Sequence, residues 1–214
     1  LPARSGLGTS STFAVGMLNA FYAIKGKTVG QRKLAEDAIK LERELCKENG
    51  GWLDQIAAAF GGLNRIDFKD CSFRVTPIVI HPERKKILDD NLMLFYTGVS
   101  RFSSDIQKST MASSADNISQ LKEILSLVDN AQAILEDKHS DMNDFGRLLD
   151  HTWQLKRQTG GMVSNDAIDA LYKRGLKAGA LGGKLLGAGG GGFLLFYVPK
   201  ERQEAVMKEL NEHM

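Results

Sequence analysis

The first chemically suggestive segment of the sequence is Ser5–Ser11, where two glycines precede three hydroxyl residues. Gly6 and Gly8 can adopt positive φ without strain, and Thr9, Ser10 and Ser11 favour helix starts. The N–H groups of a first helical turn have no intrahelical partner, so they suit an anion, and hydroxyl groups can hold a magnesium ion on a phosphate. The segment therefore predicts an anion site, although an ordinary capped helix would use the same residues.

The common nucleotide-binding motifs do not fit this segment. The Walker A pattern needs a lysine after its second glycine, and Thr9 follows Gly8. The G-x-G-x-x-G fingerprint needs a third glycine where Ser11 stands. A dinucleotide-dependent oxidoreductase would also need an acidic ribose ligand about 20 residues further on, and Glu36 comes later than that. The sequence thus disfavours this class.

Two carboxylates form the second candidate group. Glu42 is expected late in a helix, and Asp54 follows Gly50-Gly51 near the start of the next helix. Carboxylates on adjacent elements can converge, so that one holds a metal and the other handles a proton. The alternative interpretation makes Glu42 a solvated helix residue and Asp54 an N-cap.

The third group is the C-terminal glycine run, in which five of the six residues from Gly187 to Gly192 are glycine. A tight hairpin needs only two glycines, and each glycine adds a conformational entropy cost on folding. The run therefore indicates a backbone that approaches a ligand or the first glycine loop closely.

The elements that must position these groups are mainly helical. Hydrophobic periodicity and turn residues predict helices over residues 9–25, 31–47, 103–115, 117–136, 141–157 and 165–177, with short ones around 56–60 and 82–89 and a last one from Lys200. Strands are expected over residues 63–68, 73–80, 92–97, 184–186 and 193–198, the first two as a hairpin. This order favours an α+β fold over a doubly wound α/β fold.

Composition narrows the function classes. There are 28 basic and 26 acidic residues, so the net charge of +2 does not indicate nucleic-acid binding. No apolar run is long enough to span a membrane, and the four histidines show no ligand spacing. Cys46 and Cys71 make neither a disulfide framework nor a metal site, which favours a cytoplasmic location. The start at Leu1, inside a functional loop, leads us to expect a missing N-terminal portion.

Taken together, the three groups resemble the GHMP kinases (galactokinase, homoserine kinase, mevalonate kinase and phosphomevalonate kinase). The segment from Pro2 to Ser11 is similar to the family motif Pro-x-x-x-Gly-Leu-Gly-Ser-Ser-Ala, with Thr9 for the first serine and Ser11 for the alanine. Lys184–Gly192 resembles the C-terminal glycine motif, and Gly51-x-x-Asp54-Gln55 resembles the catalytic segment. Glu42 lies twelve residues before Asp54, as the magnesium-binding glutamate does in galactokinase-like members.

The resemblance implies a two-part α+β fold. Residues 1–80 would be the remainder of an incomplete N-terminal part like ribosomal protein S5, and residues 81–214 a helix-rich, ferredoxin-like C-terminal part. It also implies ATP and Mg²⁺ as cofactors, Asp54 as the catalytic residue, and Ser10 and Glu42 as magnesium ligands. The residues expected to bind the nucleotide are Ser5, Gly6, Leu7, Gly8, Thr9, Ser10, Ser11, Gly189 and Gly190. Those expected to bind the substrate are Arg101, Lys156, Arg157 and Gly187.

Within the family, segments such as Glu42-Arg-Glu-Leu-Cys46 and Trp153-x-Leu-Lys156-Arg157 are similar to bacterial heptose 7-phosphate kinases. The implied reaction transfers the γ-phosphate of ATP to the anomeric hydroxyl of a heptose 7-phosphate. The partner would be a small sugar phosphate, not nucleic acid or membrane, and a homodimer is left open. The alternatives are a kinase for L-fucose or another sugar and a catalytically inactive homologue. Trp153 is expected in the core, and Lys184 could contact phosphate or face solvent.

Overall fold

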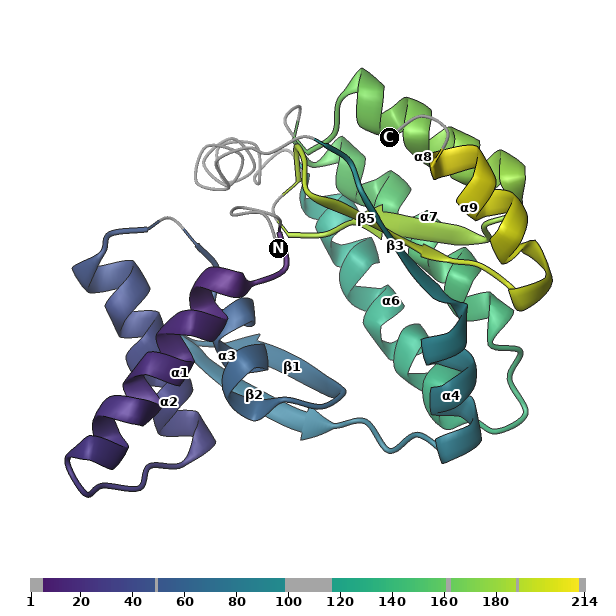
Figure 1. Ribbon diagram of the computed structural model, residues 1–214. Helices are drawn as coiled ribbons and strands as arrows, with labels where there is room; N and C mark the ends of the chain where they lie inside the picture. Colours follow the sequence, from purple (N-terminus) through teal and green to yellow (C-terminus); the bar gives the residue numbers. More distant parts are fainter. Residues whose placement is uncertain (1–5, 49, 99–116, 161–162, 188, 212–214) are drawn as a thin grey trace. The chain divides into compact units, whose positions relative to one another are not determined.

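The computed structural model describes residues 6–48, 50–98, 117–160, 163–187 and 189–211. The chain forms two compact units (Figure 1). Unit 2 is Gly8–Ile78, and unit 1 combines Leu1–Leu7 with Val79–Met214. Both contain helices together with antiparallel strands, which confirms the predicted α+β class.

The described residues of unit 2 form three α-helices, a π-helical turn and a hairpin. Its elements are α1 (Thr9–Ile24), α2 (Gln31–Lys40), the π-helical η1 (Leu41–Leu45), α3 (Leu53–Phe60), β1 (Asn64–Lys69) and β2 (Ser72–Pro77). The hairpin is confirmed, and its two-residue turn is Asp70-Cys71, both in the left-handed region as a primed turn requires. Ala35 of α2, Ile56 of α3 and Phe73 of β2 form the buried core.

The segment 31–47 is not one regular helix as predicted. After α2 the chain enters the π turn η1, in which the N–H of Cys46 bonds to the carbonyl of Leu41 at 2.9 Å. A π turn holds an extra residue, so the side chains beyond it rotate relative to α spacing. Leu45, at helical spacing from Leu34 and Ala38, is 69% exposed, whereas Glu42, four residues after Ala38, is buried. The irregular turn therefore moves Leu45 off the buried face, while Glu42 keeps its place on that face by ordinary helical spacing.

The helix predicted over residues 9–25 is confirmed as α1, but three of its large apolar residues lie on the exposed side. Phe13, Phe21 and Ile24 are more than half exposed, while Ser11 and Ala14 are buried. The buried face of α1 thus carries a hydroxyl group, which periodicity of apolar residues does not predict.

Unit 1 is built around a three-stranded antiparallel sheet in the order β3-β5-β4. The strands are β3 (Leu92–Tyr96), β4 (Gly182–Leu185) and β5 (Phe193–Tyr197). The helices are α4 (Pro82–Asn91), α6 (Ile118–Glu136), α7 (Asn143–Gln158), α8 (Asp166–Ala178) and α9 (Gln203–Asn211), with the short 3-10 turn η2 (Lys200–Arg202) before α9. The helix expected over 103–115 lies outside the described residues.

Neighbouring residues of β5 pack against different helices. A Cβ on Gly146 of α7 would lie 2.7 Å from the ring of Tyr197, and one on Gly175 of α8 would lie 2.6 Å from Phe196. Because consecutive strand residues point to opposite faces, α7 and α8 cover opposite faces of the sheet (Figure 1). Trp153 is 1% exposed within the core of this unit, which confirms its predicted core position.

Candidate active site

The start of α1 has the features of an anion site. Gly8 is the N-cap in the left-handed conformation, with φ 66°, and no side chain caps the helix. The first regular helical bond runs from the N–H of Thr12 to the carbonyl of Gly8, at 2.9 Å. The N–H groups of Thr9, Ser10 and Ser11 therefore precede the first N–H that donates within the helix, and they lie at the positive end of the helix dipole.

The serine hydroxyls of α1 point to a carboxylate instead of capping the helix. Oγ of Ser11 donates to Oε2 of Glu42 at 3.0 Å, and Oγ of Ser10 lies 3.4 Å from Oε1 of the same carboxylate. The π turn η1 supplies Glu42, which is 7% exposed. The structure thus brings together Ser10 and Glu42, which sequence reasoning had paired as metal ligands.

Gln55 is a further member of this cluster. Its Nε2 donates to Oε2 of Glu42, and the side chain is 3% exposed. The amide oxygen, Oε1, is buried and has no hydrogen-bond partner among the residues that the structure describes. Sequence reasoning gave Gln55 no role of its own. The available signal was its place directly after Asp54, which puts it in the first turn of α3 beside the candidate base.

Asp54 lies at the second position of α3, in contact with the glycine loop. A Cβ on Gly8 would be 3.4 Å from Cγ of Asp54, so the loop backbone runs against this carboxyl group. Desolvation raises the pKa of Asp54, and the negative charge of Glu42 raises it further. Asp54 nevertheless keeps an exposed surface. An accessible carboxylate with a raised pKa suits proton acceptance.

The donor set at Ser10 and Glu42 fits magnesium. Both supply hard oxygen donors, and Mg²⁺ at 2.0–2.1 Å from its ligands places adjacent ones about 3 Å apart. The 3.4 Å between Oγ and Oε1 is close to that spacing. Among the described residues no cluster of three or more His, Cys, Asp or Glu side chains could form a metal cage. A single carboxylate matches the way Mg²⁺ is held together with substrate phosphates.

In unit 1 the two glycine loops meet backbone to backbone. Gly187 has φ +72°, and a Cβ there would lie 2.9 Å from Cα of Gly6. A Cβ on Gly6, which has φ +77°, would lie 2.8 Å from the carbonyl oxygen of Leu186. The expectation that the C-terminal run approaches the first glycine loop is confirmed. A Cβ on Gly189 would be 2.6 Å from the carbonyl oxygen of Val163, so this loop is closely packed there too.

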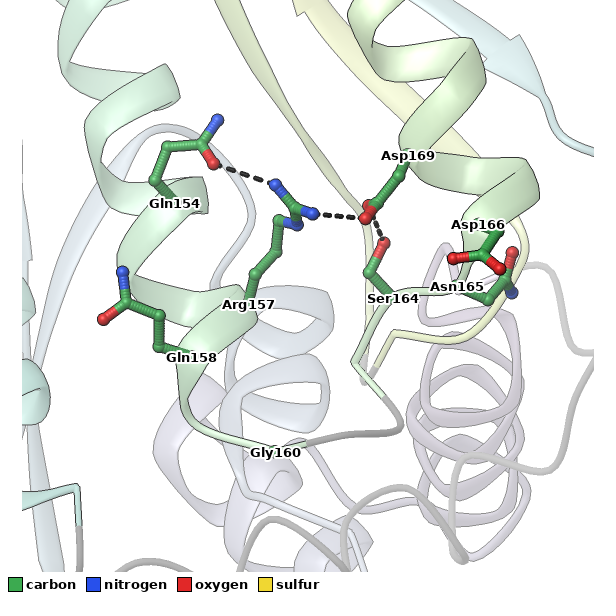
Figure 2. Close-up of a pocket in the computed structure, with 8 residues that line it drawn as sticks. All are labelled: Gln154, Arg157, Gln158, Gly160, Ser164, Asn165, Asp166 and Asp169. Atoms are coloured by element: carbon green, nitrogen blue, oxygen red, sulfur yellow. Dashed lines mark hydrogen bonds and ion pairs between the residues drawn. The ribbon is translucent and has the colours of Figure 1, made fainter.

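Lys156 and Arg157 stand side by side at the end of α7 but have different partners. Nζ of Lys156 donates to the carbonyl of Gly187 at 3.0 Å. Arg157 donates to Gln154 at 2.9 Å and forms an ion pair with Asp169, which also accepts from Ser164 at 2.5 Å (Figure 2).

Arg157 and its partners line a polar pocket of about 390 Å³ between α7 and α8 (Figure 2). The pocket is lined by Gln154, Arg157, Gln158, Gly160, Ser164, Asn165, Asp166 and Asp169. The guanidinium charge of Arg157 is already matched by Asp169, which weighs against its predicted role as a phosphate ligand. Two further predicted site residues, Ser5 and Arg101, lie outside the described residues.

Comparison with known protein families gives one match in the N-terminal part of the chain and one in the C-terminal part. Residues 1–62 match the model of the GHMP kinases N terminal domain, and residues 127–214 match that of the GHMP kinases C terminal domain. The chain belongs to the GHMP kinase family. The fold agrees, because solved GHMP kinase structures superimpose on nearly the whole chain.

Similar members of the GHMP kinase family act on different molecules. The chain is 31% identical to D-glycero-alpha-D-manno-heptose 7-phosphate kinase of Campylobacter jejuni, over 99% of this chain and 63% of that protein. It is also 31% identical to L-fucokinase/L-fucose-1-P guanylyltransferase of Bacteroides fragilis, over 96% of this chain and 22% of that protein. A D-glycero-D-manno-heptose 1-phosphate kinase structure from Bacteroides thetaiotaomicron aligns with a TM-score of 0.74 at 29% identity, covering 99% and 59% of the two chains. This chain therefore spans less than two thirds of each relative. Within its described residues, no helix is long and apolar enough to cross a membrane.

Proposed function

We propose that this GHMP kinase family member transfers the γ-phosphate of ATP to a hydroxyl group of a sugar. The observation that carries the proposal is the contact of Gly8 with Asp54. It places a carboxyl group with a raised pKa beside a helix start suited to phosphate. Glu42, with Ser10 and Ser11 against it, supplies the third part of the arrangement.

The first step is binding of the triphosphate at the start of α1. The N–H groups of Thr9, Ser10 and Ser11 donate to phosphate oxygens, and Gly8 leaves the backbone open to them. Ser10 and Glu42 would hold Mg²⁺, which when bound neutralises the charge of the phosphate oxygens. Gln55 keeps the Glu42 carboxylate in place through its hydrogen bond to Oε2.

Asp54 then acts on the acceptor hydroxyl. Its carboxylate accepts the hydroxyl proton or orients the oxygen for in-line attack on the γ-phosphate. The new bond joins this oxygen to phosphorus, the bond between the β- and γ-phosphates breaks, and ADP leaves with the bonding electron pair. Positioning and charge neutralisation supply most of the acceleration in such reactions. The raised pKa brings Asp54 nearer to the operating pH, where a general base is more effective.

For the acceptor we favour the anomeric hydroxyl of D-glycero-D-manno-heptose 7-phosphate. Support comes from the heptose kinases among the relatives and from the segments around Glu42 and Lys156. L-fucose is the second candidate, because the L-fucokinase relative is equally identical to this chain. In unit 1, Gly187 and Lys156 would contact the acceptor, and Gly189 and Gly190 would lie near the nucleotide.

The test is ATP consumption by the purified full-length protein with D-glycero-D-manno-heptose 7-phosphate, L-fucose, galactose, mannose and mevalonate. Turnover of fucose but not of the heptose phosphate would overturn the choice of acceptor. Asp54→Asn should lower turnover about 10²–10⁴-fold while nucleotide binding persists. The matched control is Asp70→Asn, in the exposed hairpin turn, which should keep full activity. Near wild-type turnover by Asp54→Asn would refute the assigned base.

A further inference from the structure

Two lysines in unit 1 place like charges close together. Lys156 lies in the last turn of α7, and Lys184 lies in β4, the strand against which α7 packs. Lys184 stands three residues before Gly187, whose carbonyl accepts a hydrogen bond from Lys156, and the positive charge of Lys184 helps to lower the pKa of Lys156. The local fold thus concentrates positive charge beside the C-terminal glycine loop, which Lys156 contacts at Gly187.

Within the described part of the chain, neither lysine forms an ion pair with a carboxylate. The ion pairs of unit 1 belong to other residues, such as Arg157 with Asp169 and Arg174 with Glu209. Burial lowers the pKa of Lys184, and that of Lys156 falls to about 8, mainly through burial. Unneutralised charges in a partly dry site cost folding free energy, and such groups cluster at functional sites.

The backbone beside these lysines is accessible. Gly187 and Gly6 are both exposed and carry no side chain that would cover the loop, although their backbones pack closely on each other. One N–H of the Lys156 ammonium group donates to the carbonyl of Gly187. The other two N–H groups can donate to another partner.

The polar pocket of Figure 2 is a poorer place for an anion. Its one cationic side chain, Arg157, is paired with Asp169, and Asp166 adds a further negative charge. The formal charge of its lining is therefore −1, from one arginine and two aspartates. The positive charge available in this part of unit 1 lies with Lys156 and Lys184 instead.

We infer that Lys156 and Lys184 together bind a phosphate group of a substrate beside the C-terminal glycine loop. A phosphate monoester carries a charge of about −1.5 to −2 at pH 7, which two lysines match, and its oxygens accept several hydrogen bonds. The inference rests on the proposed function in calling the ligand a substrate. Two sources share this chemistry, namely a phosphate already present on the acceptor sugar and the phosphates of the nucleotide.

The direct test is binding of inorganic phosphate to the full-length protein, measured by calorimetry. Lys156→Met and Lys184→Met should each weaken binding about tenfold or more, because each removes charge-assisted hydrogen bonds. Lys184→Arg should retain most of the affinity. The matched control is Lys173→Met on α8, an exposed lysine of the same unit, which should bind like the wild type. Unchanged affinity in both variants, or an equal loss in the control, would overturn the inference.

Thermal unfolding of the same variants separates binding from folding. Methionine has nearly the length of lysine and no charge to bury, so the two variants should be at least as stable as the wild type. Weaker phosphate binding with undiminished stability is the signature of a ligand site. Variants that lose binding only because they unfold early would count against it.

Steady-state kinetics distinguishes the two sources of phosphate. A KM raised for a sugar phosphate, with the KM for ATP unchanged, assigns the site to the acceptor, and the reverse pattern assigns it to the nucleotide. A change in neither KM would contradict a substrate site. The proposed function fails separately, because near wild-type turnover by Asp54→Asn would refute the assigned base, whereas phosphate binding by the two lysine variants does not depend on that result.

Discussion

The Oγ of Ser11 donates a 3.0 Å hydrogen bond to Oε2 of Glu42, thirty-one positions along the chain. This bond ties the first turn of α1 to the π turn η1 inside unit 2. Gln55 donates to the same oxygen, Oε2. The other carboxylate oxygen of Glu42, Oε1, is the one that lies near Ser10. The carboxylate is thus oriented before any ligand arrives, which reduces the entropy lost on binding.

This orientation predicts how magnesium dependence should change. Glu42→Gln keeps the size of the side chain but removes the negative charge, so the apparent affinity for Mg²⁺ in ATP binding should fall about tenfold or more. The measurement is a magnesium titration of nucleotide binding. Glu44→Gln, an exposed residue of the same π turn, is the control and should titrate like the wild type. Equal curves for both variants would remove Glu42 from the metal site.

The contact between the glycine loops predicts a difference between two alanine variants. Gly98 and Gly187 have nearly the same φ, +70° and +72°, but a Cβ on Gly98 would meet no atom of the described residues within 4 Å. Alanine at either site incurs about 1–2 kcal/mol for the left-handed backbone. Only Gly187→Ala also pushes against Cα of Gly6, so it should destabilise unit 1 more. Urea unfolding followed through Trp153, in a Trp52→Phe background, measures this, and equal losses would argue against the contact.

The hydrogen bonds of Arg84 lead us to expect a stability effect within unit 1. This buried arginine of α4 donates to the carbonyls of Ile134, Leu135, Lys138 and Ser140, at and beyond the end of α6. Arg84→Met leaves these groups unpaired and should lower the free energy of unfolding by about 2–4 kcal/mol. Lys85→Met, next to it and exposed, should change it by less than about 0.5 kcal/mol. Similar effects of both substitutions in urea unfolding would refute this role.

The lowered pKa of Lys156 leads us to expect that this residue affects the free energy of unfolding in a pH-dependent way. Its pKa is about 8 in the folded protein against an ordinary 10.5, through burial and the charge of Lys184. Below pH 8 Lys156 is charged in both the folded and the unfolded protein, so the folded protein bears the full free-energy cost of burying this charge. Between pH 8 and 10.5 the unfolded chain binds more protons, and the penalty is relieved as pH rises. The free energy of unfolding of Lys156→Met should therefore exceed that of the wild type by about 1–2 kcal/mol at pH 7, allowing for screening. At pH 10 the difference should be smaller.

The measurement is urea unfolding of both proteins at a series of pH values. Lys173→Met, which removes an exposed lysine, should show a difference from wild type that stays flat with pH. A stability gain for Lys156→Met that grows between pH 8 and 10 would have the wrong sign and would refute the lowered pKa.

Much of the local structure could be predicted from the sequence because its signals are local. The turn at Gly6 and Gly8 and the helix that follows are confirmed. The close approach of the C-terminal glycine run to Gly6 is also confirmed, since so many glycines in one loop indicate a crowded backbone. The site roles of Ser10, Glu42 and Asp54 stay predictions about function, although the structure brings these side chains together.

The rest depends on contacts that local patterns do not encode. The exposure of Leu45 depends on a π turn, and nothing in the spacing of Leu34, Ala38 and Leu45 indicates the extra residue. The unpaired position of Lys184 beside Lys156 follows from the packing of α7 on β4. There Gly182 permits the close approach, because a Cβ on it would lie 2.0 Å from the carbonyl oxygen of Gly146.

The π turn η1 also bears on how this segment can vary in length. A π turn is an α turn with one residue inserted, so removing a single residue between Lys40 and Cys46 would restore regular helical spacing. The position of the deleted residue decides what happens to Glu42. Removing Arg43 or Glu44 leaves Glu42 four residues after Ala38, on the buried face, whereas removing Leu41 shifts it to the third residue after Ala38. Loss of the Leu41 codon would therefore turn the carboxylate away from the serines of α1 and leave the helix intact, whereas loss of codon 43 or 44 would keep both.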